Sequence, residues 1–390
     1  MSATTTQETN AVSTTDDFML PVRFPAQPVG GQPQPSAELD ELYRGFDKQS
    51  LVPLWTQIEG LMPSVPQSKA QPHLWEWKEL IALARASGSL VPVGRGGERR
   101  AIALANPSLN GRPYVSSTLW CAIQYLMPGE VAPWHRHTQH AFRFVVEGEG
   151  VWTVVNGDEV PMRRGDFLPQ GGWNWHAHHN PSSTPMAWID GLDIPFAYET
   201  ESTFFDFGDD ELEQQRGPER SRSERLWGHP GLAPLSQLGS TAGSPLLAYR
   251  WQDTDAALRE QLLIEEEGYA VTVEPGHAAV RYTNPTNARD IAPTMRTQMH
   301  RIRRGTETAP VRSVGTRVFQ VFDGAASVKV GDFSWSATRG DIFVVPSWKS
   351  FSVKSEAGAS DSDSGALDLF EFSDAPIFEA LGQYRTITEG

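Results

Sequence analysis

Short apolar runs broken by Gly, Pro, Asn and Asp dominate the chain from about residue 101 onward. Runs such as FRFVVEG, GVWTVVNGD and RGDFLPQGG predict the strands and turns of an antiparallel barrel. Around 201–275 the chain becomes polar and charged, with one helical stretch, ALREQLLIEEEG, that ends at Gly268. The strand pattern then returns. We therefore expect an all-β fold with two barrel-forming regions, 101–200 and 276–390, and a linker region over 201–275.

A different pattern precedes the first strands. Residues 1–35 are rich in Thr, Ser, Gln and Pro, which predicts a disordered tail. The range 36–100 predicts a helical N-terminal arm with two helices, one that follows Ser36 as its N-cap and one that stops near Gly88. Their apolar faces, at helical spacing, are Leu39, Leu42, Tyr43 and Phe46 in the first helix and Trp77, Leu80, Ile81 and Ala84 in the second.

The two barrel-forming regions are copies of one another. Turn residues recur in both at a nearly constant offset, and even the segments that leave the barrels, GLDIPF and FSDAPIF, correspond. The matched turns are Asn106-Pro107 with Asn284-Pro285, Gly129 with Gly305, Gly148 with Gly324, and Gly165-Asp166 with Gly340-Asp341. The sequence therefore predicts one barrel built twice.

Composition narrows the class of protein. A length of 390 residues suits about two domains, and a net charge of −15 argues against a nucleic-acid binder, which needs a basic surface. Cys121 is the single cysteine, so we expect no internal disulfide and a reducing compartment. No apolar run reaches the length of a membrane span, and the N-terminus lacks the pattern of a signal peptide. We therefore expect a cytoplasmic protein without a membrane partner.

Most of the ten histidines fall between residues 135 and 179. His135 and His137 are two residues apart, so in a strand both side chains point to the same face. Gly129 precedes this pair, and His176 follows the turn at Gly165-Asp166. A lone HxH pair is a weak signal, and in isolation surface or core histidines would explain it. The flanking glycine turns favour a metal site instead.

This arrangement resembles the two motifs of the cupin superfamily: a Gly, five residues and HxH, then a Gly-centred turn followed by His176 and Asn180. The resemblance implies two tandem double-stranded β-helix (jelly-roll) barrels, a bicupin. The chain departs from the motifs at Ala141, where cupins usually carry a Glu ligand, and at Gly171, where they carry Pro. Three neutral imidazoles suit zinc, iron, copper or nickel, and an octahedral ion would keep three adjacent positions open.

The second copy lacks all three ligands. The matched offsets place Val311, Ser313 and Phe351 at the positions of the three histidines. We therefore expect a metal-binding barrel over 101–200, a second barrel over 276–390 without metal ligands, and one metal ion per chain.

Arginines near the histidines suggest an anionic substrate. Arg95, Arg99 and Arg100 lie in the glycine-rich segment GRGGERR, and Arg143 lies inside an apolar strand, where a buried charge needs an anionic partner. The planar guanidinium can bind both oxygens of a carboxylate. For Arg100 an ordinary surface position explains the sequence as well.

Four segments, GRGGERR, STLWCAIQYL, PWHRHTQHAFRFVVEGEGVWTVVNG and MAWIDGLDIPF, resemble the gentisate 1,2-dioxygenase family, whose relatives cleave salicylate or 1-hydroxy-2-naphthoate. The similarity runs from about residue 38 to the C-terminus, apart from a Ser/Asp-rich insertion near 355–366. It implies a ring-cleaving dioxygenase of aromatic catabolism that uses Fe(II), one per chain, and O2 as co-substrate, with a small aromatic carboxylic acid as substrate and a homotetrameric assembly.

The resemblance also implies roles for single residues. The iron ligands would be His135, His137 and His176, and the substrate pocket would be lined by Arg95, Arg99, Gln124, Arg143 and Trp120. His178 and Asp190 would be the catalytic residues, although a supporting role explains His178 as well. Gentisate, opened to maleylpyruvate, is the expected substrate. The alternatives are salicylate, 1-hydroxy-2-naphthoate, a zinc isomerase, a decarboxylase or oxidase of dicarboxylates, and a metal-binding cupin without dioxygenase activity.

Overall fold

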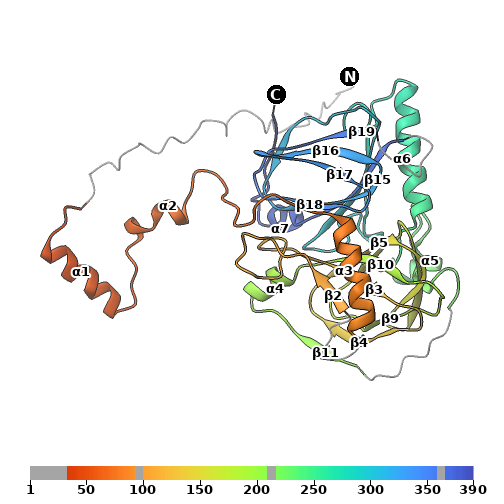
Figure 1. Ribbon diagram of the computed structural model, residues 1–390, viewed down its shortest axis with the longest axis horizontal. Coiled ribbons are helices and arrows are strands. Elements are labelled where there is room, and N and C mark those ends of the chain that lie inside the picture. The colour runs from red at the N-terminus through yellow and green to blue at the C-terminus, as the bar shows by residue number, and fades with distance from the viewer. Residues whose placement is uncertain (1–32, 94–99, 209–216, 358–364, 390) are drawn as a thin grey trace, which may run out of the picture. The chain divides into compact units, whose positions relative to one another are not determined.

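The computed structural model describes residues 33–93, 100–208, 217–357 and 365–389. The chain forms two compact units, Met1–Gln67 and Ser68–Gly390. In the first unit, α1 (Ala37–Lys48) is followed by a short 3-10 helix (Leu54–Thr56) and α2 (Ile58–Leu61) (Figure 1). The side chain of Ser36 accepts a hydrogen bond from the backbone N–H of Leu39 at 3.1 Å, which confirms Ser36 as the N-cap.

Two five-stranded antiparallel sheets form the first barrel. Successive side chains of a strand point to opposite faces, and nearly all side chains are buried along five of these strands, so both faces of those strands are covered. In spatial order, one sheet contains β2 (Ala101–Ala103), β3 (Trp120–Leu126), β10 (Met186–Leu192), β5 (Ala141–Glu147) and β8 (Phe167–Gln170). The other contains β11 (Phe205–Phe207), β4 (Val131–His137), β9 (His176–His179), β6 (Glu149–Val155) and β7 (Asp158–Arg163).

The second barrel repeats this arrangement. Its six-stranded sheet contains β1 (His73–Trp75), β18 (Ile342–Val345), β15 (Arg317–Asp323), β20 (Leu367–Ser373), β13 (Arg296–Ile302) and β12 (His277–Arg281). Its five-stranded sheet contains β17 (Phe333–Thr338), β16 (Ala325–Val330), β19 (Phe351–Glu356), β14 (Val311–Ser313) and β21 (Thr386–Thr388). When the six-stranded sheet is read in reverse, from β12 to β18, its strand order matches that of the first barrel's sheet from β2 to β8. The matched strands are β12 with β2, β13 with β3, β20 with β10, β15 with β5, and β18 with β8. The predicted repeat is confirmed.

The repeat extends to the helices. A short helix follows the last barrel strand in each half, α4 (Ile194–Glu199) in the first and α7 (Ala375–Ala380) in the second. A longer helix precedes the barrel in each half, α3 (Trp77–Leu90) and α6 (Trp251–Glu266), and α5 (Arg222–Trp227) lies before α6. Helix α3 continues past Gly88, where a side chain would press on Tyr125 and Met127. Helix α6 ends before Gly268, as predicted.

Each half contributes the segment before its long helix to the other barrel. Strand β1 pairs with β18 of the second barrel, and the backbone N–H of Trp77 donates to Asp341 at 2.8 Å. In the matching place, Tyr249 bridges to Phe167 of the first barrel, and the backbone N–H of Trp251 donates to Asp166 at 3.1 Å. The predicted Gly-Asp turns of both barrels are therefore held by the helix that belongs to the other half.

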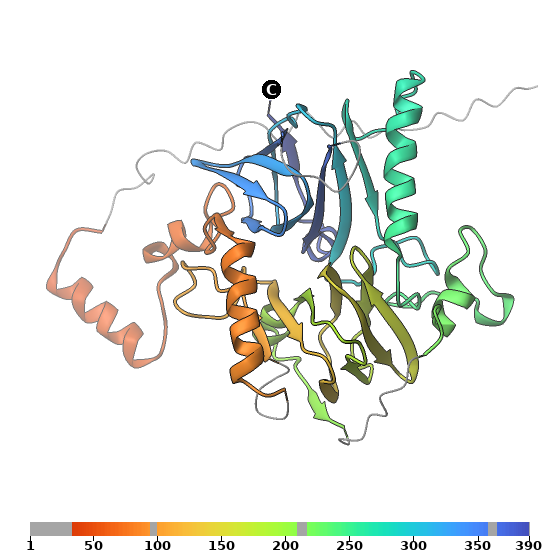
Figure 2. The ribbon, with the colours of Figure 1, turned by 45° about the vertical axis from the view of Figure 1, so that its right-hand side comes forward.

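The two barrels lie next to each other (Figure 2). One apolar core contains side chains from both of them. Phe144 stacks on Phe370 with ring centroids 4.1 Å apart, and Phe142 meets Phe372 edge-on at 4.9 Å. These rings come from facing strands, β5 and β20, so burial of one barrel's outer face depends on the other barrel. Among the described residues, no helix is both long and apolar enough to cross a membrane.

Candidate functional site

Three buried histidines meet inside the first barrel. Strand β4 places His135 and His137 on one face, and the β4–β9 ladder places His176 directly opposite His135. One ligand-type atom from each ring lies within 4.8 Å of the others. The ring centroids are 4.1 Å apart for His135 and His176, and 5.1 Å apart for His137 and His176.

Backbone carbonyls orient all three rings in the same way. Nδ1 of His135 lies 3.2 Å from the carbonyl oxygen of Pro133, Nδ1 of His137 lies 3.0 Å from that of Gln139, and Nδ1 of His176 lies 2.9 Å from that of Asn174. Because a carbonyl only accepts, each of these contacts is a hydrogen bond when Nδ1 holds the ring proton, and that tautomer leaves the lone pair on Nε2. Partners of this kind orient histidine ligands in metal sites. The donor set fits a first-row transition metal.

The equivalent place in the second barrel is built differently. Val311 faces Phe351 across β14 and β19, in the register in which His135 faces His176. Arg317 occupies the position of Ala141, where cupins usually carry Glu. Its Nε and NH2 each donate to the carboxylate of Glu371 at 2.8 Å. Among the residues that the structure describes, the three histidines of the first barrel form the one metal-type group of three.

A network of buried polar side chains lies beside the histidines. Arg143 on β5 donates from Nε to Nε2 of His178 at 3.2 Å and from NH2 to Oε1 of Gln170 at 2.6 Å. Asp190 lies 3.7 Å from the same Nε and accepts a hydrogen bond from Trp188 at 3.1 Å. The anionic partner that the sequence required for Arg143 is therefore Asp190. Burial lowers the pKa of Arg143 to about 10, with Asp190 opposing the shift, so Arg143 stays cationic at neutral pH.

The other predicted pocket residues lie at different distances from this network. Gln124 is buried on β3, opposite Trp188, and its Nε2 has no hydrogen-bond partner among the described residues. Trp120 lies half-buried at the start of β3, opposite Leu192. Arg95 and Arg99 fall outside the described residues.

Arg100 is part of the scaffold. Its side chain is 4% exposed and forms an ion pair with Glu130, so the surface interpretation of this arginine is wrong. It also donates to the backbone carbonyls of Val91 and Tyr125, at 2.9 and 2.7 Å. These contacts tie the chain after α3 to β3.

Sequence reasoning missed Gln170 and Phe205. Gln170 ends a four-residue strand, FLPQ, and nothing in that run singles it out. Phe205 on β11 stacks on His135 with ring centroids 5.3 Å apart, from within the range expected to be a linker. Both positions follow from strand pairing, which joins residues distant in sequence.

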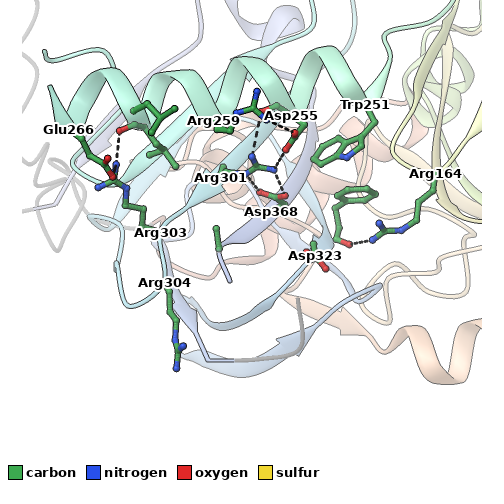
Figure 3. A pocket seen from close by; sticks show the side chains of 14 residues that line it. Arg164, Trp251, Asp255, Arg259, Glu266, Arg301, Arg303, Arg304, Asp323 and Asp368 are labelled. Carbon is green, nitrogen blue, oxygen red and sulfur yellow. Dashed lines mark hydrogen bonds and ion pairs between the residues drawn. The ribbon is translucent and has the colours of Figure 1, made fainter. Parts of the chain in front are cut away.

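A separate cavity of about 740 Å³ lies between α6 and the second barrel (Figure 3). Several arginines line it, but acidic neighbours pair with them: Arg301 with Asp255 and Asp368 at 2.8 Å, and Arg303 with Glu266 at 2.9 Å. It contains none of the histidines, so the catalytic site is not placed there.

Known proteins resemble this chain over most of its length. Residues 122–194 match the model of the cupin domain. Gentisate 1,2-dioxygenase of a Streptomyces species is 57% identical over 348 residues, which cover 89% of this chain and 95% of that protein. Gentisate 1,2 dioxygenase 1 of Aquipseudomonas alcaligenes is 32% identical, over 91% of this chain and 97% of that protein.

A solved structure matches this chain over most of its length. It is the structure of salicylate 1,2-dioxygenase from Pseudoaminobacter salicylatoxidans in adducts with gentisate. The two sequences are 56% identical, and the TM-score is 0.88. The match covers 92% of this chain and 96% of that one.

Proposed function

The chain belongs to the gentisate 1,2-dioxygenase family of ring-cleaving bicupin enzymes, and we propose that it opens gentisate (2,5-dihydroxybenzoate) with O2. The observation that supports this most is the shared orientation of His135, His137 and His176, whose Nδ1 protons all point to backbone carbonyls. The reaction breaks the ring bond between the carboxyl-bearing carbon and its hydroxyl-bearing neighbour. Both oxygen atoms of O2 enter the product, maleylpyruvate.

The proposed cofactor is one Fe(II) per chain, held by Nε2 of the three histidines. When bound, the ion supplies a Lewis acid and a route for electrons between the aromatic ring and O2. Ala141 leaves the ligand set at three nitrogens, so positions remain for substrate oxygens. Phe205 covers His135 on one side and limits the access of water to that ring.

The substrate carboxylate is assigned to the arginine side of the pocket. Arg143 provides a buried cation, and Asp190 holds its guanidinium in place. Gln124 offers a buried amide N–H that has no partner among the described residues. Arg95 and Arg99 are proposed as further carboxylate ligands, and Trp120 as a wall for the ring.

His178 is the proposed acid–base residue. Its Nε2 accepts the hydrogen bond from Arg143, so the proton of the neutral ring lies on Nδ1. The proton that His178 can pass to the substrate is therefore the one on Nδ1. Asp190 acts through Arg143, because its carboxylate fixes the cation that orients His178.

Salicylate is the second candidate substrate. The observation that favours it is the 56% identity with salicylate 1,2-dioxygenase over nearly the whole chain. Salicylate lacks the second hydroxyl of gentisate, so its ring is poorer in electrons and harder to oxidise. We also propose a cytoplasmic homotetramer, in line with the family resemblance.

Oxygen uptake tests the proposal. Protein loaded with Fe(II) is given gentisate, salicylate or 1-hydroxy-2-naphthoate, and the absorbance of the ring-opened product is followed in parallel. Gentisate should give rapid uptake matched by product, and His135→Ala should abolish it. Val311→Ala, at the equivalent position of the second barrel, is the matched control and should retain activity. No uptake with any of the three acids, despite bound iron, would overturn the proposal.

A further inference from the structure

Gln170 lies directly opposite Ala141 on the neighbouring strand. The two residues face each other directly across β5 and β8, so their side chains leave the sheet on the same side, about 5 Å apart at Cβ. Cupins usually carry a Glu ligand at the position of Ala141, and the small side chain here leaves room. The side chain of Gln170, 2% exposed, therefore lies among the residues that face the histidines.

Arg143 fixes which end of the Gln170 amide faces the histidines. A guanidinium only donates, so the atom 2.6 Å from its NH2 is the amide oxygen. Arg143 is in turn held by His178 at 3.2 Å and Asp190 at 3.7 Å. The nitrogen of the Gln170 amide must then point away from Arg143, and it points to His176.

The amide nitrogen lies against the ring of His176, which is one of the proposed metal ligands. It lies 2.7 Å from Nδ1 and 3.2 Å from Nε2 of His176. When Nδ1 directs its own proton to Asn174 it offers the amide no lone pair, so the 2.7 Å contact brings two donors together. The acceptor that the ring then offers the amide N–H is Nε2, 3.2 Å away. If Nε2 of His176 held a metal ion, its lone pair would no longer be available to the amide. A buried donor without an acceptor is costly, so the amide needs a new partner next to the metal.

We propose that Gln170 is a substrate-binding residue, whose side-chain amide donates to an oxygen of the aromatic acid held at the metal. The inference rests on the function proposed above. The carboxylate and hydroxyl oxygens of such an acid are the acceptors that a metal with open positions brings to this place. Arg143 polarises the amide through its oxygen, which strengthens the donor.

Two variants separate binding of the acid from binding of the metal. Gln170→Glu keeps an acceptor for Arg143 but replaces the donor by an oxygen that repels the acid. Gln170→Leu removes both contacts. The matched control is Gln320→Leu, because Gln320 is also buried, 1% exposed, but lies in the second barrel. Each protein is loaded with zinc, which does not turn over, and gentisate binding is measured by calorimetry together with zinc content and thermal midpoint.

Both Gln170 variants should keep one zinc per chain and bind gentisate about tenfold more weakly or worse, whereas Gln320→Leu should match the wild type. Gentisate affinities within about twofold of the wild type would overturn the inference. So would loss of zinc from Gln170→Glu, because Gln170 would then serve His176 alone. If the zinc-loaded wild type bound no gentisate, that result would overturn the proposed function and this inference together.

Discussion

Arg143 donates a hydrogen bond from its Nε to Nε2 of His178 at 3.2 Å, with both side chains buried. A permanent cation therefore lies against one nitrogen of the proposed acid–base residue and fixes its tautomer. The neighbouring His179, equally buried on β9, points to the other face of the strand. Among the described residues its two ring nitrogens have no hydrogen-bond partner.

His178→Ala and His179→Ala should separate these two positions. We expect His178→Ala to lower turnover of gentisate by about 10²- to 10⁴-fold, the usual contribution of a general acid or base. Iron content should stay near one per chain, because His178 is not among the proposed ligands. His179→Ala should keep the turnover of the folded enzyme. Steady-state kinetics and metal analysis check both, and loss of iron from His178→Ala would mark it as a residue that supports the ligands.

Removal of the metal should lower stability. A ligand at about 100 times its dissociation constant adds about 2.7 kcal/mol to the free energy of unfolding. A chelator should therefore lower the melting temperature of the iron-loaded wild type, and added Fe(II) should restore it. His135→Ala should melt at the same temperature with and without the chelator. A chelator effect that persists in this variant would place the metal elsewhere.

The second barrel should make stability depend on pH. Burial is the main cause that lowers the pKa of His277 from 6.5 to about 4, and the neighbouring His300, 3.0 Å away, contributes to the lowering, as does Arg317. Glu274, 3.1 Å away, opposes the shift. Between pH 6.5 and about pH 4, His277 of the unfolded chain binds a proton that His277 of the folded protein does not. The free energy of unfolding should therefore fall as pH drops from 6.5 to 4, by up to about 3 kcal/mol from this group.

Urea unfolding at several pH values tests this contribution. His277→Gln should lose less stability than the wild type over the window, whereas exposed His229→Gln should follow the wild type. Comparison of variants is needed because Asp374 acts in the opposite direction. Its burial raises the pKa to about 6, so this carboxyl favours the folded state as pH falls toward 4. Equal pH slopes for His277→Gln and the wild type would contradict the assignment.

Gly340 should be intolerant of a side chain. A Cβ there would lie 2.2 Å from Cγ of Trp77, and the backbone has a φ of +97°. Gly305 has a similar φ of +82°, but a Cβ there meets nothing within 4 Å. Backbone strain should lower the free energy of unfolding of both Ala variants by about 1–2 kcal/mol. Overpacking should lower that of Gly340→Ala by a further 1–3 kcal/mol, roughly. Equal free energies of unfolding in urea would exclude the packing contribution.

The sequence predicted much of this fold because the relevant signals were local. The Gly-Asp turns at Gly165 and Gly340 gave the repeat, and strand alternation placed His135 and His137 on one face. The register of Val311 with Phe351 matches that of His135 with His176, as the offsets required. Turn chemistry and a period of two are enough for such inferences.

Contacts between distant segments could not be predicted in this way. Gln170 lies opposite Ala141 on the neighbouring strand, and the buried Arg100 forms an ion pair with Glu130. Trp77 binds Asp341 from the other half of the chain. Each of these depends on which strands pair and which faces pack, and single-sequence patterns do not contain that information.

The exchange of segments before α3 and α6 suggests how such a chain can arise. Trp77 and Trp251 take equivalent places on opposite barrels, each bound to the Gly-Asp turn of the other half. Two identical single-barrel subunits that swap their leading segments would make the same pair of contacts. Fusion of two such subunits would join the dimer in one polypeptide. Only one copy would then need to retain the histidines, while each barrel would still have its Gly-Asp turn bound by a segment of the other half.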